Sequence, residues 1–340
     1  MKKLFAAISL FVCIALIFTA CGASAGSGDK TDVTETAGAG VINIGFLKGP
    51  TGLGAVQFMK RSDAGETSVK YNVQTAADPT SFTASLINGE LDIAALPVNA
   101  AATLAAKTNG KVQLLAVNTL GVMYILDSTG EVNGIADLKG KTVLSSGQGS
   151  TPEYIINYLL KENGLKPGVD VTVEYAAEHA EVAAQALAGK YGVVLLPEPF
   201  VTKLQQKNNS FRTAIDLTEE WEKLGGGEML TGCVAVRTEF AENDPQAVKS
   251  FLSDYEKSVD YALSSPDETA ALAGEYDIID AETAKAALPN CNITFMAGEE
   301  MKTNTAAYLQ VLFDADPASV GGEMPGDGFY CIPGSSSDAK

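Results

Sequence analysis

The feature that most constrains the fold is a repeat of the chain against itself at an offset of one hundred residues. Residues 43–109, laid over residues 143–209 without a gap, are identical at 13 of 67 positions. The matches include Gly49, Thr51 and Pro97, which fall in turns and at the ends of strand-like runs. A repeat of this length is a whole unit of strands and helices rather than one coil of a solenoid. We therefore predict two similar lobes.

Short apolar runs alternate with stretches of helical spacing along both copies of the repeat. This alternation is typical of parallel sheets that are covered by helices on both faces. The predicted fold class is α/β, with two similar α/β lobes joined by a hinge. The strand-like runs are 41–47, 69–75, 91–97, 112–118, 142–146, 169–176, 191–197 and 231–240.

The repeat ends near residue 230, and the rest of the chain has a helical pattern. Asp244 and Pro245 form an N-cap and a first helical turn before a long apolar stripe. Further helices are predicted at 267–275, 281–287 and 298–314. Because a segment with so little strand cannot form a third α/β lobe, we expect it to return and pack on the first lobe.

The N-terminus has the composition of an export signal. Lys2 and Lys3 precede an uncharged apolar run that ends at Ala20, and Cys21 follows. The sequence "FTAC" resembles the lipobox of bacterial lipoproteins, with Phe18 where Leu is usual. The alternative is an ordinary secretory signal with a coincidental cysteine. Residues 1–20 are thus predicted as a lipoprotein signal peptide, and residues 21–40, rich in Gly, Ala, Ser and Thr, as a lipidated flexible tether.

The net charge argues against one class of binding partner, and the cysteine content leaves one possible disulfide. The net charge is −18, and it becomes −20 in the mature chain once Lys2 and Lys3 are removed. So acidic a surface repels phosphate backbones, and nucleic-acid binding is not expected. After the signal and Cys21, the remaining cysteines are Cys233, Cys291 and Cys331; Cys291 and Cys331 are either disulfide-bonded or buried free thiols.

Several stretches resemble one family of transport proteins. The segment 136–165, with its Lys-Gly-Lys turn and Gly-Ser-Thr helix start, is similar to the second-lobe entry of the nitrate, sulfonate, taurine and thiamine-precursor binding proteins of ABC importers. The segment 193–204 is similar to that family's Glu-Pro segment, although Pro197 replaces the usual Trp. The segment 88–101 looks like its counterpart in the first lobe. The fold of that family is the type II periplasmic-binding-protein fold.

The resemblance implies how the lobes divide the chain. Lobe one would take residues 41–118 and 230–331, lobe two residues 119–229, and residues 332–340 would be a disordered tail. The crossovers near 116–121 and 225–232 would form the hinge, and Gly225 to Gly227 would absorb its dihedral changes. The implied partners are a small-molecule solute, an ABC permease and its ATPase, and the membrane through the lipid on Cys21. We expect a monomer on the outer face of the cell membrane or in the periplasm.

The candidate ligand site lies where strands enter helices, because ligands of open α/β sheets bind at the carboxyl ends of strands. The turns "KGPTG" and "QGST" are one such turn per lobe, and helix N-termini suit an oxyanion. The hydroxyls there either contact ligand or cap their own helices. The predicted ligand-binding residues are Lys48, Gly49, Pro50, Thr51, Gly52, Asn99, Asn118, Gly147, Gln148, Gly149, Ser150, Thr151 and Glu198.

Other residues are candidates for the same cleft. His179, the only histidine, opens a helical stretch, and an exposed helix start is the plainer interpretation; Asp78 holds nearly the same place in the first lobe. Trp221, the only tryptophan, lies outside the turns, which leaves Tyr124 or Tyr154 to stack on a ring. The predicted solute is small and either anionic or heterocyclic.

The sequence argues against an enzyme. A single histidine excludes multi-histidine metal sites, and the nucleotide, Cys-x-x-Cys and Gly-x-Ser-x-Gly motifs are missing, so neither a cofactor nor a metal is expected. The predicted function is delivery of a solute to an ABC importer by lobe closure. The alternatives are a ligand-sensing receptor subunit that is not tied to transport and an enzyme on the same fold.

Overall fold

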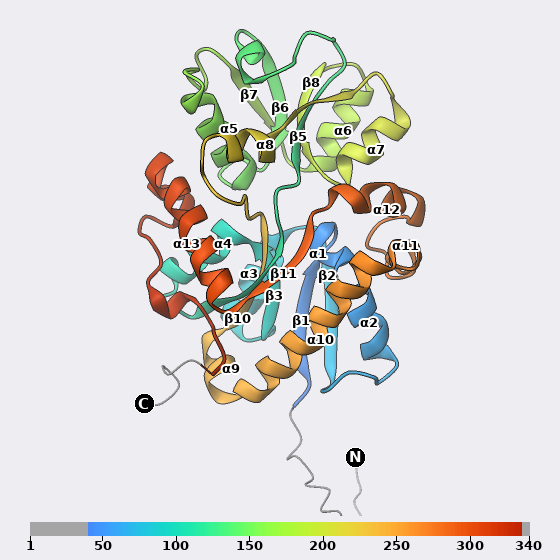
Figure 1. Cartoon of the computed structure of the whole chain (residues 1–340), viewed down its shortest axis with the longest axis vertical. Coiled ribbons are helices and arrows are strands. Elements are labelled where there is room, and N and C mark those ends of the chain that lie inside the picture. Colours follow the sequence, from blue (N-terminus) through green and yellow to red (C-terminus); the bar gives the residue numbers. More distant parts are fainter. Residues whose placement is uncertain (1–39, 335–340) are drawn as a thin grey trace, which may run out of the picture. The chain divides into compact units, whose positions relative to one another are not determined.

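Two β-sheets organise the chain, and each one lies at the centre of an α/β lobe (Figure 1). The structure is a computed structural model that describes residues 40–334. The predictions for the signal peptide, for Cys21 and for nearly all of the tether lie outside the described residues, as does most of the predicted tail.

The first sheet has the strand order β11-β4-β10-β3-β1-β2. Strand β1 runs parallel to β2 and β3, whereas β10 runs antiparallel to β3 and β4. Its strands are β1 (Ile42–Leu47), β2 (Tyr71–Ala76), β3 (Ile93–Pro97), β4 (Val112–Thr119), β10 (Gly232–Arg237) and β11 (Ile293–Ala297).

The second sheet repeats this plan with the order β7-β6-β8-β5-β9. Strand β6 runs parallel to β7 and β8, and β5 runs antiparallel to β8 and β9. Its strands are β5 (Met123–Asp127), β6 (Thr142–Ser146), β7 (Thr172–Ala176), β8 (Val193–Pro197) and β9 (Arg212–Asp216). Strands β1 and β6 begin one hundred residues apart, and so do β3 and β8, which confirms the predicted repeat and the fold class.

Helices cover both faces of each sheet, as the near-continuous apolar character of the strands requires. On the first sheet, α3 (Pro79–Asn88) and α4 (Val98–Lys107) pack on one face, and α1 (Pro50–Leu53), α2 (Val56–Asp63) and α10 (Pro245–Ser264) lie on the other. On the second sheet, α6 (His179–Leu187) and α7 (Phe200–Lys207) cover one face, and α5 (Thr151–Glu162) and α8 (Leu217–Lys223) cover the other.

The C-terminal segment is helical as predicted. It comprises α10, α11 (Pro266–Glu275), α12 (Ala281–Ala287) and α13 (Gly298–Ala315), and Asp244 caps α10 through the backbone N–H of Ala247 at 2.9 Å. Besides packing on the first lobe, α12 contacts α7 and α13 contacts α5. The side chains of Trp221 on α8 and Tyr308 on α13 pack with ring centroids 5.4 Å apart. The segment therefore also contacts the second lobe.

Some elements differ from the sequence prediction. Strands β5, β9 and β11 were not predicted, and the run 231–240 is a strand only to Arg237. Residues Thr238–Asn243 form α9 instead. Short 3₁₀ helices complete the described chain: η1 (Ile135–Leu138), η2 (Leu288–Asn290), η3 (Pro317–Val320) and η4 (Asp327–Phe329). Cys233 and Cys291 are buried free thiols, and Cys291 and Cys331 are not bonded to each other, so the alternative of a disulfide is wrong in this structure.

Two segments cross between the sheets, residues 120–122 and residues 224–231. The first is held by the backbone N–H of Leu120, which donates to the carbonyl of Asn292 at 3.0 Å, and by the Asn292 side chain, which donates to the carbonyl of Gly121. Both crossovers pack on α8: Gly121 lies against Thr218, and Gly226 lies against the indole of Trp221. None of the described helices is both long and apolar enough to cross a membrane.

We predict that Gly121→Ala destabilises the protein by about 1–3 kcal/mol, because the added methyl overpacks the first crossover. A Cβ at residue 121 would lie 2.0 Å from Thr218 Oγ1 and 2.8 Å from Thr218 Cγ2. Thr218→Ala should restore at least about 1 kcal/mol in the double variant, since Oγ1 has no hydrogen-bond partner to lose.

Chemical denaturation of the four members of this cycle measures the coupling. Gly134→Ala is the matched control, because a Cβ there meets no atom within 4 Å, and it should change the free energy of unfolding by less than about 0.5 kcal/mol. If Gly121→Ala lowers the free energy of unfolding equally in the wild type and in Thr218→Ala, the crowding at this crossover is not real.

Candidate functional site

Four strand-to-helix turns meet between the two lobes. The turns after β3 and β6 are joined by a hydrogen bond from Thr151 Oγ1 to Asn99 Oδ1 at 2.6 Å. The turns after β1 and β8 also lie together, since a Cβ at Gly49 would be 4.0 Å from Pro199 Cδ. These turns follow the carboxyl ends of parallel strands, the edge at which open α/β sheets bind ligands.

Asn99 and Thr151 are satisfied by the protein itself. Asn99 is 4% exposed and its Nδ2 also donates to the carbonyl of Ser319 at 3.3 Å, while Thr151 is 6% exposed. A buried polar group without a partner costs about 1–3 kcal/mol, so this pair stabilises the contact between the lobes. The structure brings both predicted residues to the junction, where they bond to each other.

The other predicted hydroxyls and the second asparagine also have partners. Thr51 Oγ1 donates to the carbonyl of Leu47 at 3.1 Å, and Ser150 Oγ donates to the carbonyl of Gly147 at 2.8 Å. Neither side chain caps the N–H groups of its helix. Asn118 is fully buried and donates from Nδ2 to the Tyr255 hydroxyl at 3.0 Å, inside the first lobe.

The two predicted charged residues differ in environment. Lys48 Nζ lies 2.5 Å from Asp277 Oδ2 at the surface, and this ion pair holds the pKa of the Asp277 carboxyl below its ordinary value. Glu198 is 2% exposed and accepts hydrogen bonds from the backbone N–H and Oγ1 of Thr202. Burial raises the pKa of Glu198, which the bonds from Thr202 and Asn290 only partly oppose.

The N-terminus of α5 already holds a carboxylate. Glu153 Oε2 accepts the backbone N–H of Gly149 at 2.6 Å, in the turn formed by Gly147, Gln148 and Gly149. In the other lobe α1 is a single turn of four residues, which includes the predicted Pro50 and Gly52. Both observations weaken the argument that two helix N-termini hold an oxyanion, because one is occupied and the other has little dipole.

His179 is not an exposed helix start. Its side chain is half-buried, its Nδ1 lies 2.5 Å from Ser146 Oγ, and its ring centroid lies 5.3 Å from that of Phe200. Burial lowers the pKa of His179 to about 4, so the imidazole is neutral at physiological pH. Sequence reasoning missed this because the burial comes from residues that are distant along the chain.

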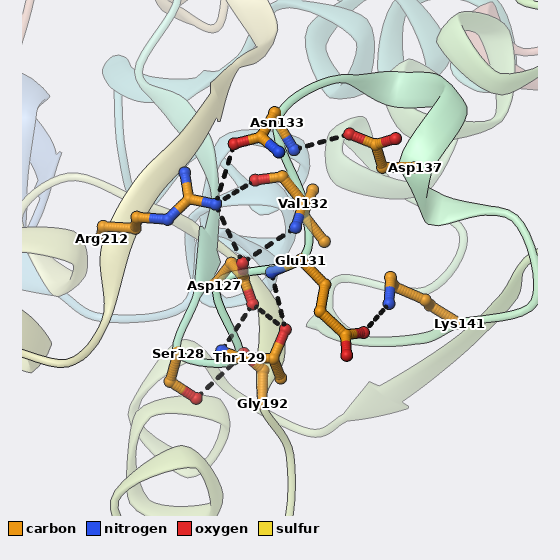
Figure 2. A network of polar contacts seen from close by, with 10 residues as sticks. All are labelled: Asp127, Ser128, Thr129, Glu131, Val132, Asn133, Asp137, Lys141, Gly192 and Arg212. Atoms are coloured by element: carbon orange, nitrogen blue, oxygen red, sulfur yellow. Dashed lines mark hydrogen bonds and ion pairs between the residues drawn. The ribbon is translucent and has the colours of Figure 1, made fainter.

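A further polar network of the second lobe surrounds Asp127, away from these turns. Figure 2 shows Asp127 accepting from Thr129, Val132 and Arg212. Burial acts to raise the pKa of Asp127, but the bonds from Thr129 and Val132, with the Arg212 charge, outweigh it and lower the pKa. Because β5 is antiparallel to β8, Asp127 pairs with Val193 at the opposite edge of the sheet from Pro197. This network holds the loop after β5.

Surface hollows on the first lobe include two that contain no predicted site residue. One, of about 330 Å³, lies beside Gly89, Gly110 and Arg237, and the other, of about 280 Å³, lies between α4 and residues 323–329. Within residues 40–334, no group of three or more His, Cys, Asp or Glu side chains is placed to hold a metal ion.

Residues 64–287 match the family described as the periplasmic substrate-binding protein of a phosphonate ABC transporter. The chain belongs to this family. It is therefore a periplasmic substrate-binding protein of an ABC importer, a class that binds small solutes and works with a permease and an ATPase. Among curated proteins none matches the chain.

Solved structures agree on the fold of this substrate-binding protein. An ABC transporter structure from Parabacteroides distasonis has a TM-score of 0.71 at 24% identity and covers 86% of this chain and 98% of its own. The aliphatic sulphonate binding protein SsuA from Escherichia coli has a TM-score of 0.68 at 16% identity, covering 86% and 92%. The nitrate-binding protein NrtA from Synechocystis has a TM-score of 0.59 at 15% identity, covering 86% and 91%.

We predict that His179 makes the protein less stable in acid. The unfolded chain takes up a proton below about pH 6.5, whereas the folded chain keeps His179 neutral down to about pH 4. Stability is therefore complete above pH 6.5 and falls as the pH drops toward 4, by about 2 kcal/mol at pH 5.

Chemical denaturation at about pH 8 and pH 5 measures this effect. Between the two pH values, the free energy of unfolding of the wild type should fall by about 2 kcal/mol more than that of His179→Phe. The difference isolates His179, because the carboxyl groups titrate alike in both proteins. An equal loss in the two proteins would mean that His179 is not buried as described.

Proposed function

We propose that the protein is a lipid-anchored extracytoplasmic receptor that captures a small anionic or heterocyclic solute between its lobes and presents it to an ABC permease. The family membership supports the class of function. The observation that carries the proposed position of the site is the pairing of turns from the two lobes: the turn after β3 bonds to the turn after β6 through Asn99 and Thr151, and the turn after β1 lies against the turn after β8. The lobe boundaries predicted from the sequence, 41–118 with 230–331 and 119–229, are part of this proposal.

Lobe closure is the proposed mechanism. The crossovers at residues 120–122 and 224–231 serve as the hinge, and a solute that contacts both lobes lowers the free energy of the closed form. Two hydrogen bonds stabilise closure together: Thr151 to Asn99 at 2.6 Å and Thr283 to Gln206 at 3.2 Å. Asn99 and Thr151 thus act at the site by joining the lobes.

We predict that Thr151→Val weakens solute binding about 5- to 30-fold. The substitution keeps the volume of the side chain but leaves Asn99 Oδ1 without its donor in the closed form, at a cost of about 1–2 kcal/mol. Solutes found by thermal shift would be titrated calorimetrically into the wild type and the variant. The fluorescence of Trp221, which packs against Tyr158 and Tyr308, would report the change in lobe contact.

Thr83→Val is the matched control for this substitution. Thr83 Oγ1 donates to the carbonyl of Pro79 within α3, so its loss should leave the affinity unchanged. If Thr151→Val binds as tightly as the wild type, closure does not depend on this contact and the proposed position of the site is wrong.

The proposed lipid anchor has a separate test. In cells given labelled palmitate, the full-length protein should become labelled and sediment with membranes, and Cys21→Ser should do neither. Cys13→Ser, a change within the apolar run, should keep both properties, since only a cysteine directly after Ala20 matches the lipobox. Labelling of the Cys21→Ser protein would contradict the anchor without affecting the proposed solute site.

A further inference from the structure

A group of three side chains in the second lobe has no counterpart in the first. Ser146 ends β6, His179 begins α6 and Phe200 begins α7. Strands β7, β6 and β8 are neighbours in the sheet, so the three residues lie at one edge, beside the turn that carries Thr151. One hundred residues earlier stand Phe46, Pro79 and Ala100, which are all apolar.

The hydrogen bond between Ser146 and His179 determines which tautomer the imidazole adopts. Ser146 is 2% exposed, and Nδ1 of His179 is the only partner of its hydroxyl among the described residues. If Nδ1 carried the proton, the buried hydroxyl hydrogen would have no acceptor, which is costly. The hydroxyl therefore donates to Nδ1, and the ring proton is on Nε2.

Nε2–H is a hydrogen-bond donor that the protein does not use. No hydrogen-bond acceptor for Nε2–H lies within residues 40–334. Nε2 is also not among the fully inaccessible polar atoms that lack a partner, so it retains some accessible surface. Phe200 supplies an apolar ring beside it. A neutral donor next to an aromatic ring is complementary to a flat ring that carries an acceptor.

The charges around the group argue against a highly charged ligand. Glu153 occupies the N–H of Gly149 in the adjacent turn and raises the pKa of Tyr175 on β7, together with burial, which is the larger cause. Glu198 is buried without an ion pair among the described residues, and Lys48 is paired with Asp277. The first turn of α5 and the turn after β8 thus carry carboxylates, which do not attract an anion.

We infer that Ser146, His179 and Phe200 form a subsite for a planar solute whose ring carries an uncharged hydrogen-bond acceptor, such as a carbonyl oxygen or an aromatic nitrogen. The acceptor binds Nε2–H of His179, and the ring lies against Phe200. Ser146 is a positioning residue, because it keeps the proton on Nε2. The inference rests on the proposed solute-binding function and selects the heterocyclic class within it.

Two matched sets of probes test the inference on the full-length protein. Uracil, cytosine and nicotinamide are flat rings with uncharged acceptors, whereas methylphosphonate, ethanesulfonate and nitrate are oxyanions. Calorimetric titration should find binding within the first set and at most weak binding in the second. A small molecule released when the purified protein is denatured, identified by mass spectrometry, should belong to the planar class.

Variants then test the assigned residues with the tightest planar probe. His179→Phe keeps a ring but removes the donor and should lower the affinity about tenfold or more. His179→Gln retains an N–H donor and should lose less affinity. Ser146→Ala no longer fixes the proton on Nε2, so its affinity should fall about threefold. Gln185→Ala, on the same helix and bonded only to Glu181, should bind like the wild type.

The outcomes separate this inference from the proposed function. If planar probes bind but both His179 variants keep full affinity, or if only oxyanions bind or are released, the subsite is wrong while solute capture between the lobes stands. If no probe binds, no molecule is released and Trp221 fluorescence never responds, both are wrong. If His179→Phe does not fold, the comparison of His179→Gln with Ser146→Ala decides.

Discussion

The hydrogen bond between Thr151 and Asn99 is the contact on which the arrangement of the two lobes depends. Each side chain comes from the turn after a central strand, one per sheet, and both are almost completely buried. A buried hydroxyl and a buried amide must have partners, so the two turns cannot separate without water or a ligand replacing this bond. The proposed solute site lies at these turns.

The C-terminal helices add further contacts between the two lobes. Helix α12 reaches α7, and α13 carries Tyr308 against Trp221 on α8, which in turn packs on both crossovers through Thr218 and Trp221. Trp221 Nε1, Thr218 Oγ1 and the Tyr308 hydroxyl are buried there without hydrogen-bond partners. The ring packing stabilises this contact, and its unpaired polar groups reduce the net stabilisation.

The sequence predicted the fold more completely than the site. Because a βαβ unit repeats as a whole, the offset of one hundred residues predicts both the order of the strands and the positions of the turns. Strands β5, β9 and β11 were not predicted, and all three lie outside the two copies of the repeat, residues 43–109 and 143–209. The site is harder to predict: Asn99 and Thr151 bond to each other across 52 positions, and the half-buried His179 contacts Ser146 and Phe200, which no local pattern reveals.

The repeat also explains why the lobes are unequal at their junction. At the positions where the second lobe has Ser146, His179 and Phe200, the first has Phe46, Pro79 and Ala100, and Phe46 is directed into its own core against Phe58 and Tyr255. The unused donor therefore belongs to one lobe alone. In the proposed mechanism, a solute recognised by that donor contacts the second lobe, and the first lobe covers it on closure. Closure of this kind excludes water from a neutral hydrogen bond, which strengthens it in a way that exposed contacts cannot.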